Sequence, residues 1–475
     1  MRECTKFYID GQWVEPSNLR TVDVINPATE EADGIVALGN EEDVNRAVAA
    51  ARRAFDSWSR TSREDRIALL ERIAAEGEKR AADLAAAMTA EMGAQKDWSS
   101  GGQVPFGLAH VSVAIEILKN FVFEEKRNNT VIRKEPIGVC AMITPWNYPL
   151  NQIFTKVAPA LATGCTMVLK PSEIAPYSAY IVAEMLDAAG VPAGVFNLVN
   201  GDGPGVGSVL SSHPEVDMVS FTGSLRAGVE VAKNAAPTVK RVQQELGGKG
   251  PNIILDDERF ADGVRQNIQA LTMNTGQSCA SPVRMLVPAA RMEEAKQVAA
   301  EEAVKVVTGD PFMDGCMMGP LTGEAQWTKV QGYIQAGIDE GAALVAGGPG
   351  RPDGLTKGYY AKFTVFGDVT PDMKIAKEEI FGPVVSIMAY QDEEEAIRIA
   401  NDTPYGLSAY VWGSDVDHAR GIADRIRAGM VFINGGNIDM VNLAFGGYKM
   451  SGNGREWGEF AFHDYVETKA ISLPG

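Results

Sequence analysis

Short apolar runs alternate with helix-like segments through the middle of the chain, and this alternation restricts the possible folds more than any other feature. The runs at 137–143 and 165–170 are mainly apolar and are soon followed by a proline, as in strands buried on both faces of a parallel sheet. The series comprises strands at 137–143, 165–170, 195–199, 216–223 and 252–256, with helices at 151–163 and 178–189. Strands joined through helices need right-handed crossovers, which predicts a doubly wound α/β sheet.

A second alternation begins after residue 260. It comprises expected strands at 283–287, 405–412 and 431–434, helices at 291–307 and 393–401, an amphipathic segment at 330–338, and a surface loop or hairpin at 341–358. Before both series, short extended segments are expected at 7–38, and apolar residues recur at helical spacing at 44–58 and 67–92. A chain of 475 residues has room for two or three packed units, so we expect two doubly wound α/β domains.

Charge and composition exclude several classes of partner. The formal net charge is -18, with 45% hydrophobic and 22% charged residues. A polyanionic nucleic acid or an anionic membrane would be repelled by such a surface unless basic residues were clustered. The N-terminal segment has no apolar signal core, and no run reaches the about eighteen apolar residues of a membrane span. We therefore expect a cytoplasmic protein that binds neither nucleic acid nor membrane.

The cysteines and histidines suggest no metal site. The five cysteines are Cys4, Cys140, Cys165, Cys279 and Cys316, without CxxC spacing and odd in number, so neither a disulfide framework nor a zinc site is predicted. Of the four histidines, His110 lies in an apolar run and is expected to be a packed, hydrogen-bonded residue. A Cys/His catalytic pair stays open, but nothing in the sequence favours it.

Polar residues and glycines follow the strands of the first series. Ligands of doubly wound sheets bind beyond the carboxyl ends of the strands, so these residues are candidates for a nucleotide site. Lys170 and Glu173 could recognise ribose hydroxyls, and Ser224 with the amides of the next helix could accept a pyrophosphate. The glycines at 201–207 lack GxGxxG spacing and, as a flexible turn, would need no ligand.

Cys279 and Glu245 are the candidates for covalent catalysis. Cys279 lies among small and polar residues, and Glu245 precedes flexible glycines. A cysteine in this setting can act as a nucleophile, and a carboxylate can act as a base toward water once a thioester has formed. The alternative is that Cys279 is a small buried apolar residue, as most lone cysteines are.

A set of short motifs runs in order along nearly the whole chain. The motifs are Thr144-Pro-Trp-Asn147, Lys170-Pro-Ser-Glu173, Phe221-Thr-Gly-Ser224, Glu245-Leu-Gly-Gly-Lys249, Gly276-Gln-Ser-Cys279, Glu379-Ile-Phe-Gly-Pro383 and Phe445-Gly-Gly-Tyr-Lys-Met-Ser-Gly452. Each motif alone is a weak signal. Taken together in this order, they resemble those of the NAD(P)-dependent aldehyde dehydrogenase superfamily.

The resemblance implies a role for each catalytic candidate. Cys279 would attack the aldehyde to give a thiohemiacetal, whose oxyanion the Asn147 side-chain amide and the backbone N–H of Cys279 would stabilise. After hydride transfer to the nicotinamide, Glu245 would activate water to hydrolyse the thioester. One branch of the superfamily passes the acyl group to coenzyme A instead, typically without this glutamate, and because Glu245 is present we expect release of a free acid.

The resemblance also implies a cofactor site. Lys170 and Glu173 would bind the adenosine ribose, Gly223 and Ser224 would lie near the pyrophosphate, and Glu379 would hold the nicotinamide ribose. The full set of expected cofactor residues is Ile143, Thr144, Pro145, Trp146, Lys170, Ser172, Glu173, Gly203, Gly207, Phe221, Thr222, Gly223, Ser224, Leu246, Glu379 and Phe381. Glu173 would repel a 2′-phosphate, which favours NAD while leaving NADP open. Alternatively, Glu173 is an acid placed to start a helix.

By this resemblance the chain divides into three parts. A Rossmann-like NAD-binding domain would comprise residues 1–117 and 137–247, and a catalytic domain residues 248–450. Residues 118–136 and 463–475 would form a small β oligomerisation arm, which implies a homodimer or a homotetramer.

Some features depart from the superfamily pattern, and other functions remain to be weighed. Ala444 stands where many members have proline, and the expected tunnel residues Asn151 and Thr155 are polar, which would suit a bulkier aldehyde. A CoA-acylating enzyme, a non-catalytic protein that keeps the fold, and a cysteine hydrolase or acyltransferase without nucleotide are the alternatives. The non-catalytic alternative predicts loss of Cys279, Glu245 or Asn147, yet all three are present.

Overall fold

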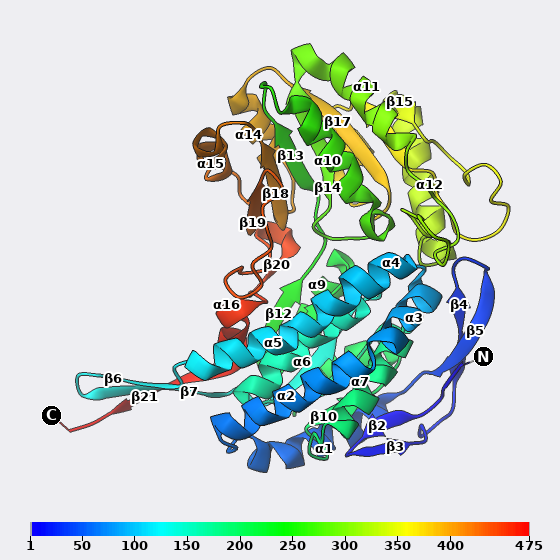
Figure 1. Cartoon of the computed structure of the whole chain (residues 1–475). Helices are drawn as coiled ribbons and strands as arrows, with labels where there is room; N and C mark the ends of the chain where they lie inside the picture. The colour runs from blue at the N-terminus through cyan, green and yellow to red at the C-terminus, as the bar shows by residue number, and fades with distance from the viewer. Residues whose placement is uncertain (1, 475) are drawn as a thin grey trace.

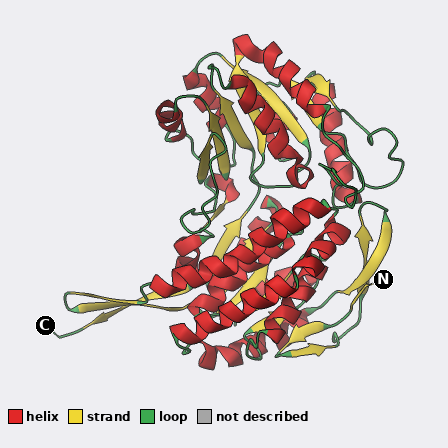
Figure 2. Cartoon of the chain, viewed as in Figure 1, coloured by secondary structure: helices red, strands yellow, loops and turns green. Residues whose placement is uncertain are grey.

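The computed structural model describes residues 2–474 and contains four β-sheets (Figure 1). Two of them are large mixed sheets of eight and seven strands, and two have three strands each. Figure 2 shows helices packed around the strands of both large sheets. The α/β fold with two wound sheets, expected from the alternation of apolar runs, is therefore confirmed.

The eight-stranded sheet is built mainly from the first alternating series. Its order is β20 (Gly452–Asn453), β12 (Arg241–Glu245), β11 (Met218–Thr222), β8 (Val139–Ile143), β9 (Thr166–Lys170), β10 (Phe196–Leu198), β2 (Phe7–Ile9) and β3 (Gln12–Val14). The five strands from β12 to β10 are parallel, while β20, β2 and β3 join antiparallel at the edges.

Helices cover both faces of this sheet because its central strands are apolar on both sides. On β8, Val139 and Ala141 belong to one core, whereas Cys140 and Met142 belong to another. The first core includes residues of α1 (Glu41–Trp58). The second core includes residues of α2 (Arg63–Lys79), α3 (Ala81–Met92), α5 (Val104–Asn120), α6 (Pro149–Thr163) and α7 (Tyr177–Ala188). Two shorter helices, α8 (Ser208–Ser212) and α9 (Leu225–Ala235), follow β10 and β11.

The seven-stranded sheet is built from the second series. Its order is β15 (Ala343–Ala346), β16 (Thr364–Gly367), β17 (Val384–Tyr390), β14 (Pro282–Pro288), β13 (Gly250–Ile254), β18 (Ser408–Trp412) and β19 (Met430–Ile433). Its helices are α10 (Phe260–Thr272), α11 (Met292–Ala303), α12 (Glu324–Asp339), α13 (Lys374–Lys377), α14 (Glu393–Asn401) and α15 (Val416–Ala423).

The two smaller sheets lie at the periphery of the eight-stranded unit. One contains β1 (Arg2–Cys4), β5 (Glu31–Ala37) and β4 (Thr21–Asn26). In the other, β7 (Thr130–Pro136) pairs antiparallel with both β6 (Glu124–Arg127) and β21 (Val466–Ser472). This second sheet protrudes from the body of the molecule as a long arm (Figure 1).

Three expectations about the elements were wrong, and one strand was missed. The run at 252–256 does not extend the first sheet, because β13 pairs with β14 and β18 of the seven-stranded sheet. The segment at 241–245 was not expected to be a strand, yet β12 lies beside β11. The helix expected at 291–307 ends at Ala303, and the helical region at 67–92 is two helices, α2 and α3.

One helical stretch, Lys96–Asn120, has the length and apolar composition of a membrane span. It comprises α4 (Lys96–Trp98), η1 (Ser99–Gln103) and α5. Val111, Ala114 and Leu118 are buried in the core, and α5 packs against α2 and α6. The stretch is thus a core helix of this fold.

Candidate active site

The carboxyl ends of the parallel strands bring the expected site residues to one edge of the eight-stranded sheet. Ile143 pairs with Lys170 on one side and with Phe221 on the other. Thr222 pairs with Glu245 at the end of β12. Because Glu245 is the last residue of its strand, its carboxylate lies at the same edge as the ends of β8, β9 and β11.

The Cys279 segment enters from the seven-stranded unit with an unusual backbone. Asn274, Thr275 and Gly276 have consecutive positive φ angles of 50°, 56° and 68°. A Cβ on Gly276 would lie 2.4 Å from the carbonyl oxygen of Gly382, so the chain after Phe381 packs directly on this turn. Such a backbone is held by its surroundings, and here it presents Cys279, which is half-buried.

A chain of amide hydrogen bonds fixes this turn to Asn147. Gln103 Nε2 donates to Asn274 Oδ1 at 3.0 Å, and Asn274 Nδ2 donates to the Asn147 carbonyl at 2.8 Å. Asn147 Nδ2 donates in turn to the Gln277 carbonyl at 3.1 Å. A side-chain amide has two N–H donors, so Asn147 keeps one N–H for a further acceptor beside the Cys279 segment.

The Glu245 carboxylate is buried without hydrogen-bond partners. It is 2% exposed, and neither oxygen has a partner among residues 2–474. Burial raises its pKa well above 4.5, the Glu456 charge raises it further, and Lys156 and Arg455 act in the opposite direction. A Cβ on Gly446 would come within 2.8 Å of Oε1, so the glycine loop covers this carboxylate.

The Cys279 thiol has a raised pKa. Burial is the largest cause, followed by the charges of Glu245 and Glu379. A carboxylate beside a thiol disfavours the thiolate. Glu245 therefore does not stabilise a resting thiolate on Cys279, and it suits the role of a proton acceptor better.

Lys170 and Glu173 form one side of the expected nucleotide site. Lys170 Nζ lies 3.3 Å from Glu173 Oε2 and donates to the Pro171 carbonyl at 2.6 Å. Burial lowers the pKa of this lysine. Helix α7 begins at Tyr177, beyond Glu173, so the alternative of Glu173 as a helix-starting acid is not supported. Ser172 Oγ accepts from the Ile174 amide at 3.2 Å.

One glycine segment lies near Lys170, and another follows the end of β11. Gly203–Gly207 forms the short helical turn η2, and a Cβ on Gly207 would lie 3.9 Å from Lys170 Cδ. Ser224 is exposed and caps α9, its side chain accepting from the Ala227 amide at 3.3 Å. Gly223 lies against the Phe221 ring. The amides that open α9 thus remain at a surface that an anion can reach.

The expected nicotinamide side is assembled from segments far apart in sequence. Glu379 Oε1 accepts from the Gly248 amide at 2.8 Å, and the Leu246 amide donates to the Ser451 carbonyl at 2.9 Å. Phe381 has a φ of 60°, and its ring packs edge-on against Trp146 at 5.5 Å between centroids. Trp146 follows Thr144 and Pro145 at the end of β8.

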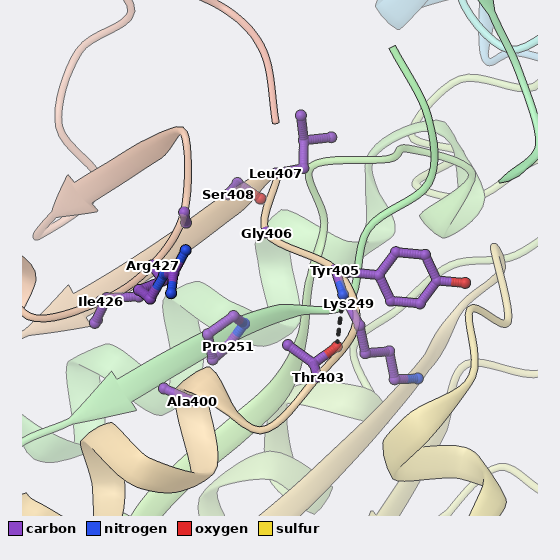
Figure 3. A pocket seen from close by; sticks show the side chains of 11 residues that line it. Lys249, Pro251, Ala400, Thr403, Tyr405, Gly406, Leu407, Ser408, Ile426 and Arg427 are labelled. Carbon is purple, nitrogen blue, oxygen red and sulfur yellow. Dashed lines mark hydrogen bonds between the residues drawn. The ribbon is translucent and has the colours of Figure 1, made fainter. Parts of the chain in front are cut away.

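Lys249 is a buried lysine next to this region. Its Nζ has no partner among the described residues, and burial lowers its pKa to about 7, with Arg284 adding to the effect. Figure 3 shows Lys249 beside Tyr405 in a pocket that Pro251, Gly406 and Ser408 also line. The pocket volume of about 10 Å³ has room for about one water molecule, so no substrate binds there.

Several residues of the site had not been singled out from the sequence. Lys156 Nζ lies 2.5 Å from Glu456 Oε1 and donates to Thr222 Oγ1 at 2.8 Å. The rings of Phe106, Phe445 and Trp457 pack together with His110. Lys156 offered a usable signal, since a lysine within an otherwise apolar helix must be paired if the helix is buried all round. Glu456 and the aromatic cluster offered none.

Two further residues have structural roles. His110 is buried, as expected, with Nε2 2.7 Å from Asn151 Oδ1, and burial lowers its pKa to about 4. The Arg284 guanidinium donates to the carbonyls of Lys249, Ile399 and Ala400, so it is not available to a substrate carboxylate. All five cysteines are free thiols, and among residues 2–474 no group of three His, Cys, Asp or Glu side chains could hold a metal ion.

Known proteins resemble this chain over its whole length. A 3-succinoylsemialdehyde-pyridine dehydrogenase from a Pseudomonas species is 54% identical over 472 residues, which cover 99% of this chain and 99% of the relative. A putative aldehyde dehydrogenase from Staphylococcus saprophyticus is 47% identical, again with 99% of both chains covered.

Solved structures have the same fold. Aldehyde dehydrogenase C from Pseudomonas syringae, a mutant complexed with NAD+ and octanal, matches with a TM-score of 0.98 and 52% identity over 99% of this chain and 96% of that one. Betaine aldehyde dehydrogenase from Staphylococcus aureus, in complex with NAD+, matches with a TM-score of 0.95 and 38% identity over 98% and 94%. A protein-family model described as "Aldehyde dehydrogenase family" matches residues 13–471 of this chain. This chain therefore belongs to the aldehyde dehydrogenase family.

Proposed function

We propose that this chain oxidises an aldehyde to the carboxylic acid with NAD+, using Cys279 as nucleophile, Asn147 as oxyanion donor and Glu245 as base. One observation carries the proposal. The Cys279 turn of one unit is hydrogen-bonded to Asn147 of the other, while the unpartnered Glu245 carboxylate lies close enough to raise the pKa of the Cys279 thiol.

The first step is attack of Cys279 Sγ on the aldehyde carbon. The thiol proton leaves to solvent, and the Glu245 carboxylate, whose pKa burial raises, is kept as the base for water in the second half of the reaction. As the C–S bond forms, the carbonyl electrons move to oxygen. The remaining Asn147 N–H and the backbone N–H of Cys279 are the donors for this oxyanion.

The second half of the reaction frees the acid. Bound NAD supplies the acceptor for the hydride that leaves the thiohemiacetal carbon. Glu245 then takes a proton from water, the hydroxide attacks the thioester, and the Cys279 thiolate leaves. A base that is buried and free of other hydrogen bonds can hold this water without competition.

The residues present fit NAD. We propose that Lys170 and the half-exposed Glu173 bind the ribose hydroxyls, and that the exposed Ser224 with the amides opening α9 binds the pyrophosphate. Glu173 adds a negative charge where NADP would place a 2′-phosphate, so NAD is the favoured cofactor. We propose the same roles for the other expected cofactor residues at these strand ends and for Glu379, Phe381 and Leu246.

For the substrate, we infer an aldehyde larger than acetaldehyde. Thr155 is a small residue at a position where family members that prefer aliphatic aldehydes usually carry a larger aromatic one. Its hydroxyl and the side-chain oxygen Oε1 of Gln152 are buried without partners among the described residues, which leaves polar groups on this face of α6. Similar proteins are named for a pyridine semialdehyde and complexed with octanal.

The oligomeric state, the cellular location and the domain division are also proposals. We propose that the arm formed by β6, β7 and β21 pairs subunits into a homodimer or homotetramer, and that the protein acts in the cytoplasm. We also retain the division into an NAD-binding domain, a catalytic domain and the arm. Because Glu245 is present, hydrolysis is favoured over acyl transfer to coenzyme A.

The test is NADH absorbance with a panel of aldehydes. Wild-type protein and Cys279→Ser are each mixed with NAD and acetaldehyde, octanal, benzaldehyde or a pyridine semialdehyde. We expect NADH formation by the wild type only, with octanal or the pyridine semialdehyde ahead of acetaldehyde. No NADH with any aldehyde, or NADH that forms only when coenzyme A is added, would refute the proposed reaction.

A further inference from the structure

An ion pair links the N-terminal segment to the glycine turn of the expected nucleotide site. Arg20 Nη2 lies 3.0 Å from Asp202 Oδ2, with the two side chains 57% and 33% exposed. Asp202 is the residue before η2, and its other oxygen, Oδ1, accepts from the Gly205 amide at 2.6 Å. Both carboxylate oxygens of Asp202 are therefore engaged, one by the turn and one by Arg20.

Arg20 is attached to the body of the protein. Its carbonyl accepts from the Leu38 amide at 2.7 Å, and the next amide along, Gly39, donates to the Asn200 carbonyl at 2.8 Å. Asn200 directly precedes the glycine turn. The guanidinium is thus held at the edge of η2, and a Cβ on Gly205 would lie 3.6 Å from Nη2.

The Arg20–Asp202 pair adjoins a second pair, Lys170–Glu173. Gly207, at the end of η2, lies beside the Lys170 side chain, and Asp202 as well as Glu173 acts electrostatically on Lys170. Two cations and two carboxylates are therefore grouped around the place where the proposed function puts the adenosine ribose. Their charges cancel, which suits a neutral ribose hydroxyl pair.

A 2′-phosphate would meet different conditions. It carries nearly two negative charges and binds best to a guanidinium, which can donate two parallel hydrogen bonds. Arg20 is the more exposed cation of this group, yet its guanidinium is already ion-paired with Asp202. Asp202 also adds a second carboxylate to the repulsion from Glu173.

We propose that Asp202 is a specificity-determining residue that selects NAD over NADP by holding Arg20 away from a 2′-phosphate. The inference rests on the proposed function, in which Lys170 and Glu173 bind the adenosine ribose. It assigns to Arg20 and Asp202 a share of the selectivity that Glu173 alone would otherwise carry.

The experiment compares kcat/KM for NAD and NADP in four proteins: wild type, Asp202→Asn, Arg20→Met and the double variant. Asn keeps an oxygen to cap the Gly205 amide, so the turn is preserved. In Asp202→Asn, the NAD to NADP ratio is expected to fall about tenfold because Arg20 becomes free. In the double variant most of that change is expected to disappear, because the guanidinium is gone.

Two results would overturn the inference. One is an unchanged ratio in Asp202→Asn with an unchanged thermal midpoint. The other is a double variant that keeps the full change, since Arg20 would then have no part in selectivity. Glu173→Gln separates this test from the proposed function: if wild type makes NADH but Glu173→Gln leaves the ratio unchanged, the ribose placement itself is wrong.

Discussion

The Lys156 ammonium and the Glu456 carboxylate form an ion pair inside the protein, with Nζ 2.5 Å from Oε1 although the residues are 300 positions apart. Lys156 is 0% exposed and Glu456 4%. The pair connects α6 to the chain after the glycine loop, and both charges influence the pKa of Glu245. It therefore holds together the walls around the proposed base.

Breaking this pair should destabilise the fold strongly. Lys156→Met leaves the Glu456 carboxylate buried and unpaired, so we expect a loss of about 3–5 kcal/mol in the free energy of unfolding, measured by urea denaturation. Lys156→Met with Glu456→Gln should recover part of the loss, since no lone charge remains. Lys233→Met, which removes an exposed pair with Glu230, is the matched control and should leave the midpoint nearly unchanged.

Replacing Glu245 should separate the two halves of the reaction. In Glu245→Gln we expect a first burst of NADH near one per active site, followed by turnover at least about 100-fold slower, because no base activates water. Stopped-flow absorbance measures both phases. Loss of the burst as well would mean that Glu245 is also needed to take the Cys279 proton, and an unchanged steady-state rate would contradict its role as base.

Removing the Asn147 amide should weaken oxyanion stabilisation. Asn147→Ala is expected to lower kcat by about 10²–10³-fold, the usual loss for one oxyanion donor. The variant also loses the hydrogen bond to the Gln277 carbonyl, so its thermal midpoint must be measured alongside. Asn45→Ala, an exposed change on α1, is the control for amide loss in general. A kcat within about threefold of wild type would argue against Asn147 as a donor.

The buried Lys249 amine predicts a stability that depends on pH. Its folded pKa is about 7 against an ordinary value of 10.5. Between these two pKa values the unfolded chain binds more protons than the folded chain, so the free energy of unfolding rises with pH over this window. At pH values below the folded pKa the buried amine is charged, which destabilises the fold. Lys249→Met should therefore be more stable than wild type near pH 6.5, with the difference shrinking toward pH 9.5. Urea denaturation at several pH values tests this, and a difference independent of pH would contradict it.

Elements defined by local pattern could be predicted well. The helix at 393–401 matches α14 residue for residue, and the strands at 137–143 and 165–170 contain β8 and β9 with ends moved by one or two residues. The strand β12 was missed because its sequence, Arg-Val-Gln-Gln-Glu, is not apolar, and only its place beside β11 makes it a strand. The run at 252–256 was given to the wrong sheet because strand order depends on contacts between distant segments.

The sequence by itself determined which residues are proposed to carry the chemistry. Cys279, Glu245 and Asn147 were identified from short motifs, and the alternation of apolar runs was enough to predict two wound sheets. Both are local sequence patterns, so they can be recognised without knowing the fold. The environment of those residues was decided only by the tertiary structure. The burial of Glu245, the hydrogen bond that turns Asn147 toward the Cys279 segment, and the Lys156–Glu456 pair all depend on groups brought together from distant positions. Since pKa and orientation follow from burial and nearby charges, they are properties of the folded chain and not of any one segment.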